Sequence, residues 1–407
     1  MQANNKLKVF NDPIYGFITI PNSLIFDLIE HKYFQRLRRI TQMGLSYLVY
    51  PGAHHTRFQH AIGSMYLMQK AVRVLRYKGV VINEEEENAL YMAILLHDIG
   101  HGPFSHAVEN SLVKGVSHEA ISLLFMEELN KNFNSNLTLA IKMFKGEYER
   151  KFMCQLISSQ LDMDRTDYLK RDSFYSGAAE GNINSERIIT MLNVADNNLV
   201  VEEKGIYSVE KFLVARRLMY WQVYLHKTSL VAEQLLIRAL SRAKELISKG
   251  ENLNCSGALK FFLKNNITAE NFDVNVLKEF SKLDDNDIIS AMKEWQYHHD
   301  FVLRNLCEMI INRDLLKIKL SKNKFDPDIL KQKNDKLMLK HKITSSEAKY
   351  FVFSGKISNL AYQEKIQTIN ILQKSGEIED IVKASDQLNL KALSKPVSKY
   401  YICYPKD

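Results

Sequence analysis

A histidine and an aspartate, His97 and Asp98, stand side by side at the end of the apolar run ALYMAILL. Successive residues on a helix point about 100° apart, but at a helix end both side chains can reach one ion. An imidazole and a carboxylate supply nitrogen and oxygen ligands. This mixed set suits Mn, Fe, Co, Ni or Zn better than Mg or Ca, which prefer oxygen alone. The pair therefore indicates a metal site that other segments must complete.

Two further segments carry residues that can complete such a site. HHTRFQH ends in His60, at the start of a predicted helix over 61–78, and LDMDRTDYLKRD at 161–172 supplies carboxylates. GHGPFSH follows the His-Asp pair, and its glycines let backbone come close to a ligand. Its histidines would need polar partners if they were buried in a core. Together the segments favour a metal site over a chance dipeptide.

Two other features have a plainer interpretation. A second pair, His299 and Asp300, lies in the helical stretch EWQYHHDFVLRNL, which has no glycine and no following histidine. We interpret it as structural. The acidic run at 84–87 is interpreted as a solvated helix start, where the helix dipole favours negative charge.

The elements that must position these residues are mostly helices. Apolar residues recur at spacings of three and four over 61–78, 84–98, 118–131 and 209–248. Only 7 of the 407 residues are Pro and 16 are Gly, so few positions break a helix. LKVFNDPIYGFITI at 7–20 predicts a small hairpin. The segments 141–151 and 176–206 are polar and predict loops or short elements.

The residue pattern of the chain changes after about residue 320, where KNKFDPD interrupts the helical periodicity. Beyond it, KYFVFSG and KYYICYP predict short strands. The fold class is therefore mainly α, with a short N-terminal β-hairpin and a small α+β C-terminal region. We divide the chain into a catalytic region at 1–315, with its metal core at about 50–175, and the C-terminal region at 316–407.

Charge and cysteine usage bound the surroundings of the protein. The net charge of +8 suits polyanions such as nucleotides or nucleic acid, although mildly basic proteins are common. The four cysteines lie far apart, which argues against disulfides and fits a reducing cytoplasm. The N-terminal residues lack the apolar core of a signal peptide. The apolar run at 89–96 is far shorter than the roughly 20 residues that span a bilayer, so we expect no membrane partner.

The motifs also carry a family resemblance. The pattern H…HD…D, with FQRLRRITQMGLSYLVYPGAHHTRFQH, HDIGHGPFSH and DMDRTDYLKRD, resembles the HD phosphohydrolases and, among them, the deoxynucleoside triphosphate (dNTP) triphosphohydrolases. The resemblance covers roughly residues 10–310 and implies an HD-domain helical bundle. It implies one divalent metal, with Mg²⁺ as an additional ion arriving with the substrate. The implied ligands are His60, His97, Asp98 and Asp164, with Asp162 as the alternative to Asp164.

The same resemblance implies an activity and a set of residues for it. The family reaction splits a dNTP into a deoxynucleoside and inorganic triphosphate. The implied catalytic residues are His101, His106, Glu109 and His118. His106 and Glu109 are three residues apart and would share a helix face as the acid pair. The implied substrate-binding residues are Gln42, Arg57, Arg165, Tyr168, Asp172, Arg216 and Tyr224.

Other functions and partners stay open at this point. The chain could be another HD phosphohydrolase, a nucleotide phosphatase or phosphodiesterase, or a non-enzymatic protein that binds nucleic acid. The resemblance implies a homo-oligomer, a dimer or tetramer, and a nucleotide activator. Gln35 and Arg38 match the family's activator segment, whereas Glu30, His31 and Lys32 depart from its guanine-reading pattern.

Overall fold

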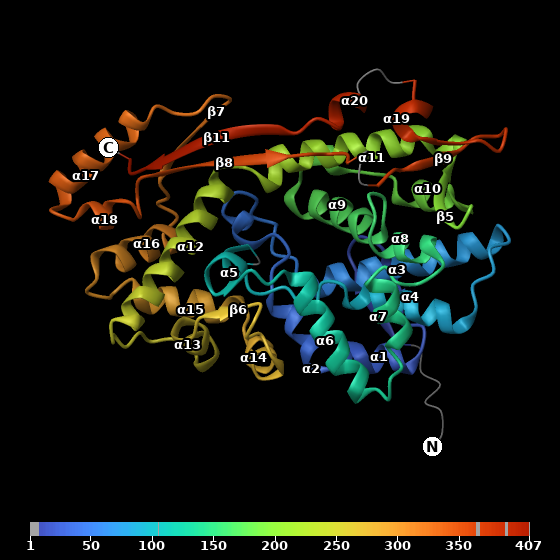
Figure 1. Cartoon of the computed structure of the whole chain (residues 1–407), viewed down its shortest axis with the longest axis horizontal. Helices are drawn as coiled ribbons and strands as arrows, with labels where there is room; N and C mark the ends of the chain where they lie inside the picture. Colours follow the sequence, from blue (N-terminus) through green and yellow to red (C-terminus); the bar gives the residue numbers. More distant parts are fainter. Residues whose placement is uncertain (1–7, 105, 364–366, 387–389, 407) are drawn as a thin grey trace.

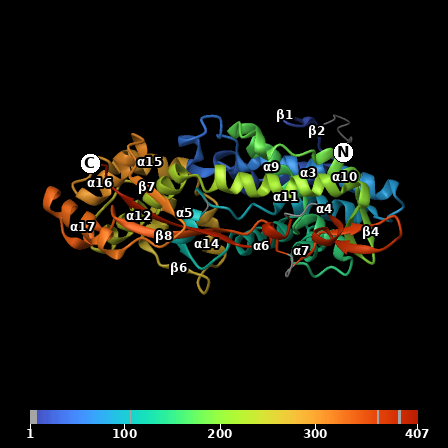
Figure 2. The same ribbon diagram turned by 90° about the horizontal axis from the view of Figure 1, so that it is seen from above.

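The computed structural model describes residues 8–104, 106–363, 367–386 and 390–406. Over these residues the chain is mainly helical, with a hairpin near the N-terminus and small sheets in the C-terminal part, which confirms the predicted fold class (Figure 1). Seen from above, the molecule is elongated, and the two termini lie toward opposite ends (Figure 2). None of the helices formed by the described residues has the length and apolar character needed to cross a membrane.

The predicted N-terminal hairpin is present. Strand β1 (Val9–Asp12) pairs antiparallel with β2 (Gly16–Thr19), so that Asp12 faces Gly16 at the turn. The Asp12 carboxylate accepts the backbone N–H groups of Ile14 and Tyr15, which holds the turn closed. Three short helical elements follow: α1 (Ser23–Glu30), α2 (Lys32–Gln35) and the 3₁₀ turn η1 (Arg36–Arg39).

Three helices form the frame of the metal region. Helix α3 (Arg57–Tyr77) packs against both α4 (Glu84–Leu96) and α9 (Met163–Ser176). Asn83 and Glu86 form a capping box at the start of α4, so the acidic run does begin a helix. Glu86 is nevertheless buried and pairs with Arg150, so the interpretation of the run as solvated is wrong at that position. Asp162 caps α9 at its N-terminus, and Gly177 ends it in the left-handed conformation.

Four helices lie between α4 and α9 along the chain: α5 (His106–Ser111), α6 (His118–Asn132), α7 (Thr138–Phe144) and α8 (Lys151–Ile157). Helix α6 confirms the pattern at 118–131. Between α7 and α8 the chain is a turn, in the polar segment that predicts loops or short elements.

The polar segment 176–206 contains a hairpin that the sequence analysis did not single out. It is made of β4 (Leu192–Ala195) and β5 (Asn198–Glu202), after the short helix α10 (Ser185–Thr190). The two turn residues, Asp196 and Asn197, have φ of 49° and 62°. Asp and Asn tolerate this left-handed backbone, and such a pair between two apolar runs is a hairpin signal.

The helical pattern at 209–248 is two helices rather than one. Helix α11 (Ile206–Met219) runs into a π-helical turn, η5 (Tyr220–Tyr224), before α12 (Lys227–Ser248) begins. His226 caps α12 by accepting the Thr228 N–H. Four further helices pack around α12 or follow it: α13 (Gly257–Lys264), α14 (Val274–Phe280), α15 (Asp285–Trp295) and α16 (Phe301–Ile311).

The C-terminal residues form strands that lie along the helical part. One sheet has the order β7-β11-β8, from β7 (Lys317–Ser321), β8 (Phe353–Asn359) and β11 (Val397–Tyr404), which confirms the two predicted strand regions. Helix α17 (Pro327–His341) lies between β7 and β8 in sequence. In Figure 1, β8 and β11 run roughly parallel to α11, whereas α12 slants away below them.

A second sheet joins two C-terminal strands to the hairpin β4–β5. Strand β9 (Asn370–Leu372) pairs parallel with β5, and β10 (Ile378–Asp380) extends the sheet to the order β10-β9-β5-β4. The C-terminal residues therefore complete a sheet that the preceding region starts. The boundary after residue 315 stays a prediction. The four cysteines are free thiols, as expected.

Candidate metal centre and substrate cavity

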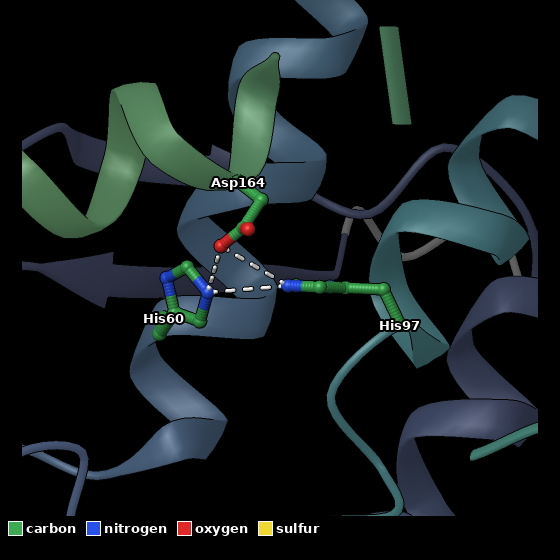
Figure 3. A group of neighbouring side chains, drawn as sticks. All are labelled: His60, His97 and Asp164. Carbon is green, nitrogen blue, oxygen red and sulfur yellow. Dashed lines mark hydrogen bonds and ion pairs between the residues drawn. The ribbon is translucent and has the colours of Figure 1, made fainter. Parts of the chain in front are cut away.

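The predicted metal ligands come from three helices that meet. His60 lies in the first turn of α3, His97 caps the C-terminal end of α4, and Asp164 lies in the first turn of α9. Figure 3 shows these three side chains pointing toward a common point. Asp98 follows His97 directly and is also buried.

The spacing of the three donor atoms fits a bound cation. Asp164 Oδ1 lies 3.1 Å from His60 Nε2 and 3.3 Å from His97 Nε2, and the two nitrogens are 3.3 Å apart. Ligands about 2.0–2.2 Å from one ion lie roughly 3.0–3.5 Å from each other when they are neighbours in an octahedron or tetrahedron. The three atoms therefore have the separations of ligands around one metal.

The hydrogen bonds of the two rings leave the right atoms free for a metal. His60 Nδ1 lies 2.7 Å from Asp167 Oδ2, and His97 Nδ1 lies 2.6 Å from the carbonyl oxygen of Ile94. Each Nδ1 therefore carries the proton, and each Nε2 offers a lone pair. Two lone pairs and a carboxylate oxygen directed at one point repel one another unless a positive charge lies between them.

The electrostatics of the site agree with this need for positive charge. Burial lowers the pKa of His60, but the carboxylates of Asp164 and Asp167 outweigh it and raise the pKa to about 10. The site therefore stabilises a positive charge at His60 Nε2, which a divalent ion bound between the three side chains would supply.

Asp98 lies beside this group and connects it to two further side chains. Its oxygens are 3.4 Å from His97 Nε2 and 3.7 Å from His60 Nε2. Arg57 Nη1 donates to Asp98 Oδ2 at 2.6 Å. Burial raises the pKa of Asp98, but the neighbouring imidazoles and Arg57 hold it well below its usual range. Asp98 is therefore an anion at the edge of the metal centre.

The choice between Asp164 and Asp162 has a geometric basis. Asp162 accepts the N–H groups of Arg165 and Ser159 as the cap of α9, and its carboxylate pairs with the Arg165 guanidinium. Its side chain is fully buried in that role. Of the two aspartates, Asp164 is the one in contact with both imidazoles.

The further histidines form a stack beside Asp98. The rings of His101 and His118 are parallel, with centroids 3.9 Å apart, and His101 Nε2 lies 3.3 Å from Asp98 Oδ1. Burial, and then the charge of Arg57, lower the pKa of His101 to about 3, so this ring is neutral at pH 7. His118 Nδ1 lies 3.1 Å from Glu109 Oε1.

The expected acid pair can be followed only in part. The side chain of His106 lies outside the described residues. Glu109 is described, and its carboxylate contacts His118. The assignment of His106 as the acid stays a prediction.

The backbone of this loop is fixed by a residue that the sequence analysis missed. The buried Arg36 donates to the carbonyl oxygens of His101, Ile99 and Leu283. Gly100 packs on α6: a Cβ there would lie 2.2 Å from the His118 carbonyl oxygen. The close approach that this glycine permits is therefore to a neighbouring helix and not to a ligand.

A cavity of about 330 Å³ lies next to the metal centre. Its lining includes five of the predicted substrate residues: Gln42, Arg57, Tyr168, Asp172 and Tyr224. Arg57 belongs to both parts of the site, because it lines the cavity and bonds to Asp98. Burial, and then Tyr220, raise the pKa of Tyr168 well above its usual range, so its hydroxyl stays protonated.

The two other predicted cationic residues do not line this cavity. Arg165 pairs with Asp162. Arg216 is buried, and its Nε and Nη1 have no hydrogen-bond partner among the described residues. A buried guanidinium with unmet donors can bind an anion.

One cavity wall depends on a second missed residue, His55. Its Nε2 lies 2.7 Å from Asp172 Oδ1, and the other carboxylate oxygen of Asp172 accepts the Tyr224 hydroxyl. The His55 ring stacks on Tyr175. Spacing gave no signal for His55, because its partners, Asp172 and Tyr175, both lie on α9, more than 110 positions further along the chain. Asp167 could have been found, since it lies three residues after Asp164 on the same helix face.

The second His-Asp pair has the geometry of a structural element. Asp300 caps α16 by accepting the Leu303 N–H, and it pairs with Arg242. His298 and His299 contact Glu251 at 3.2 and 3.4 Å. His298 Nδ1 accepts the Asp300 N–H, which leaves the ring proton on Nε2, directed at Glu251. The contact of His298 with Glu251 is thus a hydrogen bond from a neutral imidazole to a carboxylate.

Comparisons with known proteins agree with the fold and with the predicted family. The HD domain family matches residues 57–194, and the HD associated region matches residues 183–254. The solved structure of a phosphohydrolase from Bacteroides thetaiotaomicron is 53% identical, covers 98% of this chain and 100% of that chain, and superimposes with a TM-score of 0.96. The fold and the histidine–aspartate site therefore define a helical hydrolase of the HD class.

Two relatives extend the comparison. The uncharacterized protein YwfO of Bacillus subtilis is 35% identical over 330 residues, which are 77% of this chain and 73% of that protein. The deoxynucleoside triphosphate triphosphohydrolase SAMHD1 homolog of Dictyostelium discoideum is 29% identical over 265 residues, 60% of this chain and 51% of that protein. The chain belongs to the HD-domain phosphohydrolase family, as the motifs predicted, and is similar to its dNTP triphosphohydrolases.

Proposed function

We propose that this phosphohydrolase splits dNTPs into deoxynucleosides and inorganic triphosphate. The observation that carries the proposal is the position of Arg57, which bonds to Asp98 and lines the 330 Å³ cavity. A nucleotide whose base and sugar occupy that cavity would place its 5′ phosphates at the metal centre, beside the guanidinium of Arg57. The similarity to dNTP triphosphohydrolases supports the same substrate class.

The proposed ligands are His60, His97, Asp98 and Asp164. A divalent ion bound there would lower the pKa of a water molecule and neutralise phosphate charge. The two imidazole nitrogens favour Mn, Fe, Co, Ni or Zn, with Mg²⁺ arriving on the substrate. The protein's own part is to hold the ligand atoms in place without any rearrangement when the ion binds.

The surrounding residues have distinct proposed tasks. Arg57, Arg165 and Arg216 neutralise the triphosphate, because guanidinium groups bind phosphate oxygens in pairs. The neutral His101 lies near the α-phosphate, and His106 donates the proton that the leaving 5′ oxygen needs, supported by Glu109 and His118. Each of these roles is a proposal.

The sugar end of the cavity is assigned to four residues. Tyr168 packs against the deoxyribose and leaves little room for a 2′ hydroxyl. The Asp172 carboxylate accepts a hydrogen bond from the sugar hydroxyl, Gln42 lies near the 3′ hydroxyl, and Tyr224 flanks the base. The contacts from His55 and Tyr224 to Asp172 support this, since they hold the carboxylate at the cavity wall.

We also propose a homo-oligomer activated by a nucleotide, in the cytoplasm. A second cavity supports the activator: it is lined by Arg38, Phe58, Asn11 and Gln59, among others. The Arg38 guanidinium lies 3.6 Å from the centroid of the Phe58 ring and donates to Gln35. An arginine beside an aromatic ring suits a phosphorylated nucleotide.

Product analysis tests the proposed activity. Purified protein is incubated with Mn²⁺ or Mg²⁺ and each dNTP, and the products are separated by ion-exchange chromatography. We expect deoxynucleoside and inorganic triphosphate in equal amounts. Orthophosphate or pyrophosphate would instead assign a different HD phosphohydrolase reaction. Salt-sensitive binding of single-stranded nucleic acid without any hydrolysis would assign a binding function.

A further inference from the structure

A chain of buried charges leads from the metal centre to the N-terminal hairpin. Asp167 Oδ2 contacts His60 Nδ1 at 2.7 Å and accepts Arg171 Nε at 2.9 Å. On its other side, Arg171 Nη1 donates to Asp12 Oδ2 at 2.8 Å. His60, Asp167 and Arg171 are fully buried, and Asp12 is 8% exposed. Water therefore screens none of these contacts effectively.

Asp12 and the Arg171–Asp167 pair are held in place by different elements, the hairpin turn and helix α9. Asp12 Oδ1 accepts the N–H groups of Ile14 and Tyr15, so its carboxylate is fixed by the turn of the β1–β2 hairpin. Arg171 binds both oxygens of Asp167, through Nε at 2.9 Å and Nη2 at 3.0 Å. A bidentate pair of this kind fixes the plane of the carboxylate as well as its position.

Helix α3 leaves space for this pair at a single glycine. A Cβ at Gly63 would lie 2.1 Å from Arg171 Nη2 and 2.3 Å from Asp167 Oδ1. The ion pair therefore packs directly against the backbone of α3, one helical turn after His60. Such close seating leaves Asp167 no alternative orientation while Arg171 is in place.

We propose that Asp12 and Arg171 are positioning residues of the metal centre and act on His60 through Asp167. Asp12 anchors the far side of Arg171, Arg171 orients the Asp167 carboxylate, and Asp167 keeps the proton on His60 Nδ1. His60 Nε2 then presents its lone pair toward His97 and Asp164. The inference rests on the proposed metal centre, and it makes metal affinity depend on the N-terminal hairpin β1–β2, which contributes no ligand.

Metal binding to the full-length protein tests this inference without any substrate. Metal-free protein is titrated with Co²⁺, followed by visible absorption and by competition with a chelator. Asp167→Asn should weaken Co²⁺ binding by about 10- to 100-fold, the usual effect of losing a ligand's hydrogen-bond partner. Asp12→Asn, which keeps an acceptor for the turn, and Arg171→Lys should each weaken it by at least about threefold.

A double variant and a matched control separate this effect from lost stability. Asp12→Asn combined with Asp167→Asn should bind Co²⁺ no more weakly than Asp167→Asn alone, because the chain is already broken. Asp300→Asn removes a comparable aspartate–arginine pair, with Arg242, and should leave the affinity unchanged. Thermal unfolding of each variant establishes that it is folded.

The possible results are distinct. Wild-type Co²⁺ affinity in folded Asp12→Asn and Arg171→Lys proteins would overturn the inference while leaving the metal centre intact. Equal weakening by Asp300→Asn would overturn it as well, because the effect would then follow stability. Failure of the wild-type protein to bind Co²⁺ would instead overturn the metal centre itself.

Discussion

Each histidine of the metal centre owes its free lone pair to a hydrogen bond made on the opposite side of its ring. For His60 the partner is Asp167, and for His97 it is the Ile94 carbonyl oxygen. These bonds keep a proton on each Nδ1, so Nε2 is the nitrogen that each ring can offer to an ion. The ligand set therefore depends on residues that never touch the ion.

The first prediction concerns the ligands themselves. His97→Ala or Asp98→Ala should abolish both metal binding and hydrolysis, because each substitution removes one of the four proposed metal ligands. Metal content by plasma mass spectrometry and product formation measure the two losses. His299→Ala is the matched control, since it alters an exposed residue of the second His-Asp pair and should change neither. Retained activity in either site variant would remove the basis of the assignment.

The second prediction separates chemistry from metal binding. His106→Ala should keep its metal and lose turnover by at least about 10²-fold, the usual size for a missing general acid. Single-turnover rates and metal content are measured on the same preparation. A variant that has lost its metal would show that His106 is needed for the centre itself.

At the scale of elements, the contact between α3 and α9 sets the position of the ligands they carry. This contact includes Gly63, over which the Asp167–Arg171 pair lies. Gly63→Ala should lower the free energy of unfolding by about 1–3 kcal/mol, because the added methyl group overlaps two buried side chains. Chemical denaturation measures the change. Gly257→Ala is the control, since a Cβ there meets nothing within 4 Å, and its stability should match or slightly exceed that of the wild type.

A fourth prediction follows from the junction of α15 with the loop after α4. Asp285 accepts the Thr41 N–H and hydroxyl and the Phe104 N–H. Burial nevertheless raises the pKa of Asp285 to about 6. The folded protein thus holds this proton more tightly than the unfolded chain, whose aspartates have a pKa of about 3.9.

The sign of the pH effect follows from that difference. The stability contributed by protonated Asp285 is complete below about pH 4 and is lost as the pH rises through about 6. Relative to Asp285→Asn, the wild type should lose about 2–3 kcal/mol between pH 4 and pH 7. Urea denaturation across this range measures it. Parallel pH profiles for the two proteins would contradict the prediction.

At the scale of the whole molecule, the C-terminal strands are part of the fold that carries the site. Strand β9 pairs with β5, and the buried Ile371 and Ile381 pack in the common core. The fifth prediction is that a chain ending at residue 315 has a markedly lower melting temperature than the full chain, because it exposes the edge of β5 and apolar surface. Calorimetry of both chains checks this, and equal melting temperatures would show that the C-terminal region is dispensable.

Local sequence determined much of this protein. Periodicity predicted α3, α4 and α6. Helix α6 buries one face, which its own residues reveal, whereas α4 is buried on every side from Ala89 to Leu96 and shows as an apolar run. The motifs identified His60, His97 and Asp164 as candidate ligands and placed the chain in its family. The hairpin β4–β5 escaped notice, although its Asp196-Asn197 turn was a usable signal.

The partners of these residues were decided by the tertiary structure alone. Asp12 and Arg171 are 159 positions apart, and His55 and Asp172 are 117 apart, so no spacing rule relates them. Arg36 holds the loop at His101 from 65 positions away in the chain. Periodicity reports which side of an element faces the core, whereas the pairing of buried charges depends on which elements meet there. That meeting follows from packing over the whole chain, which no single segment encodes.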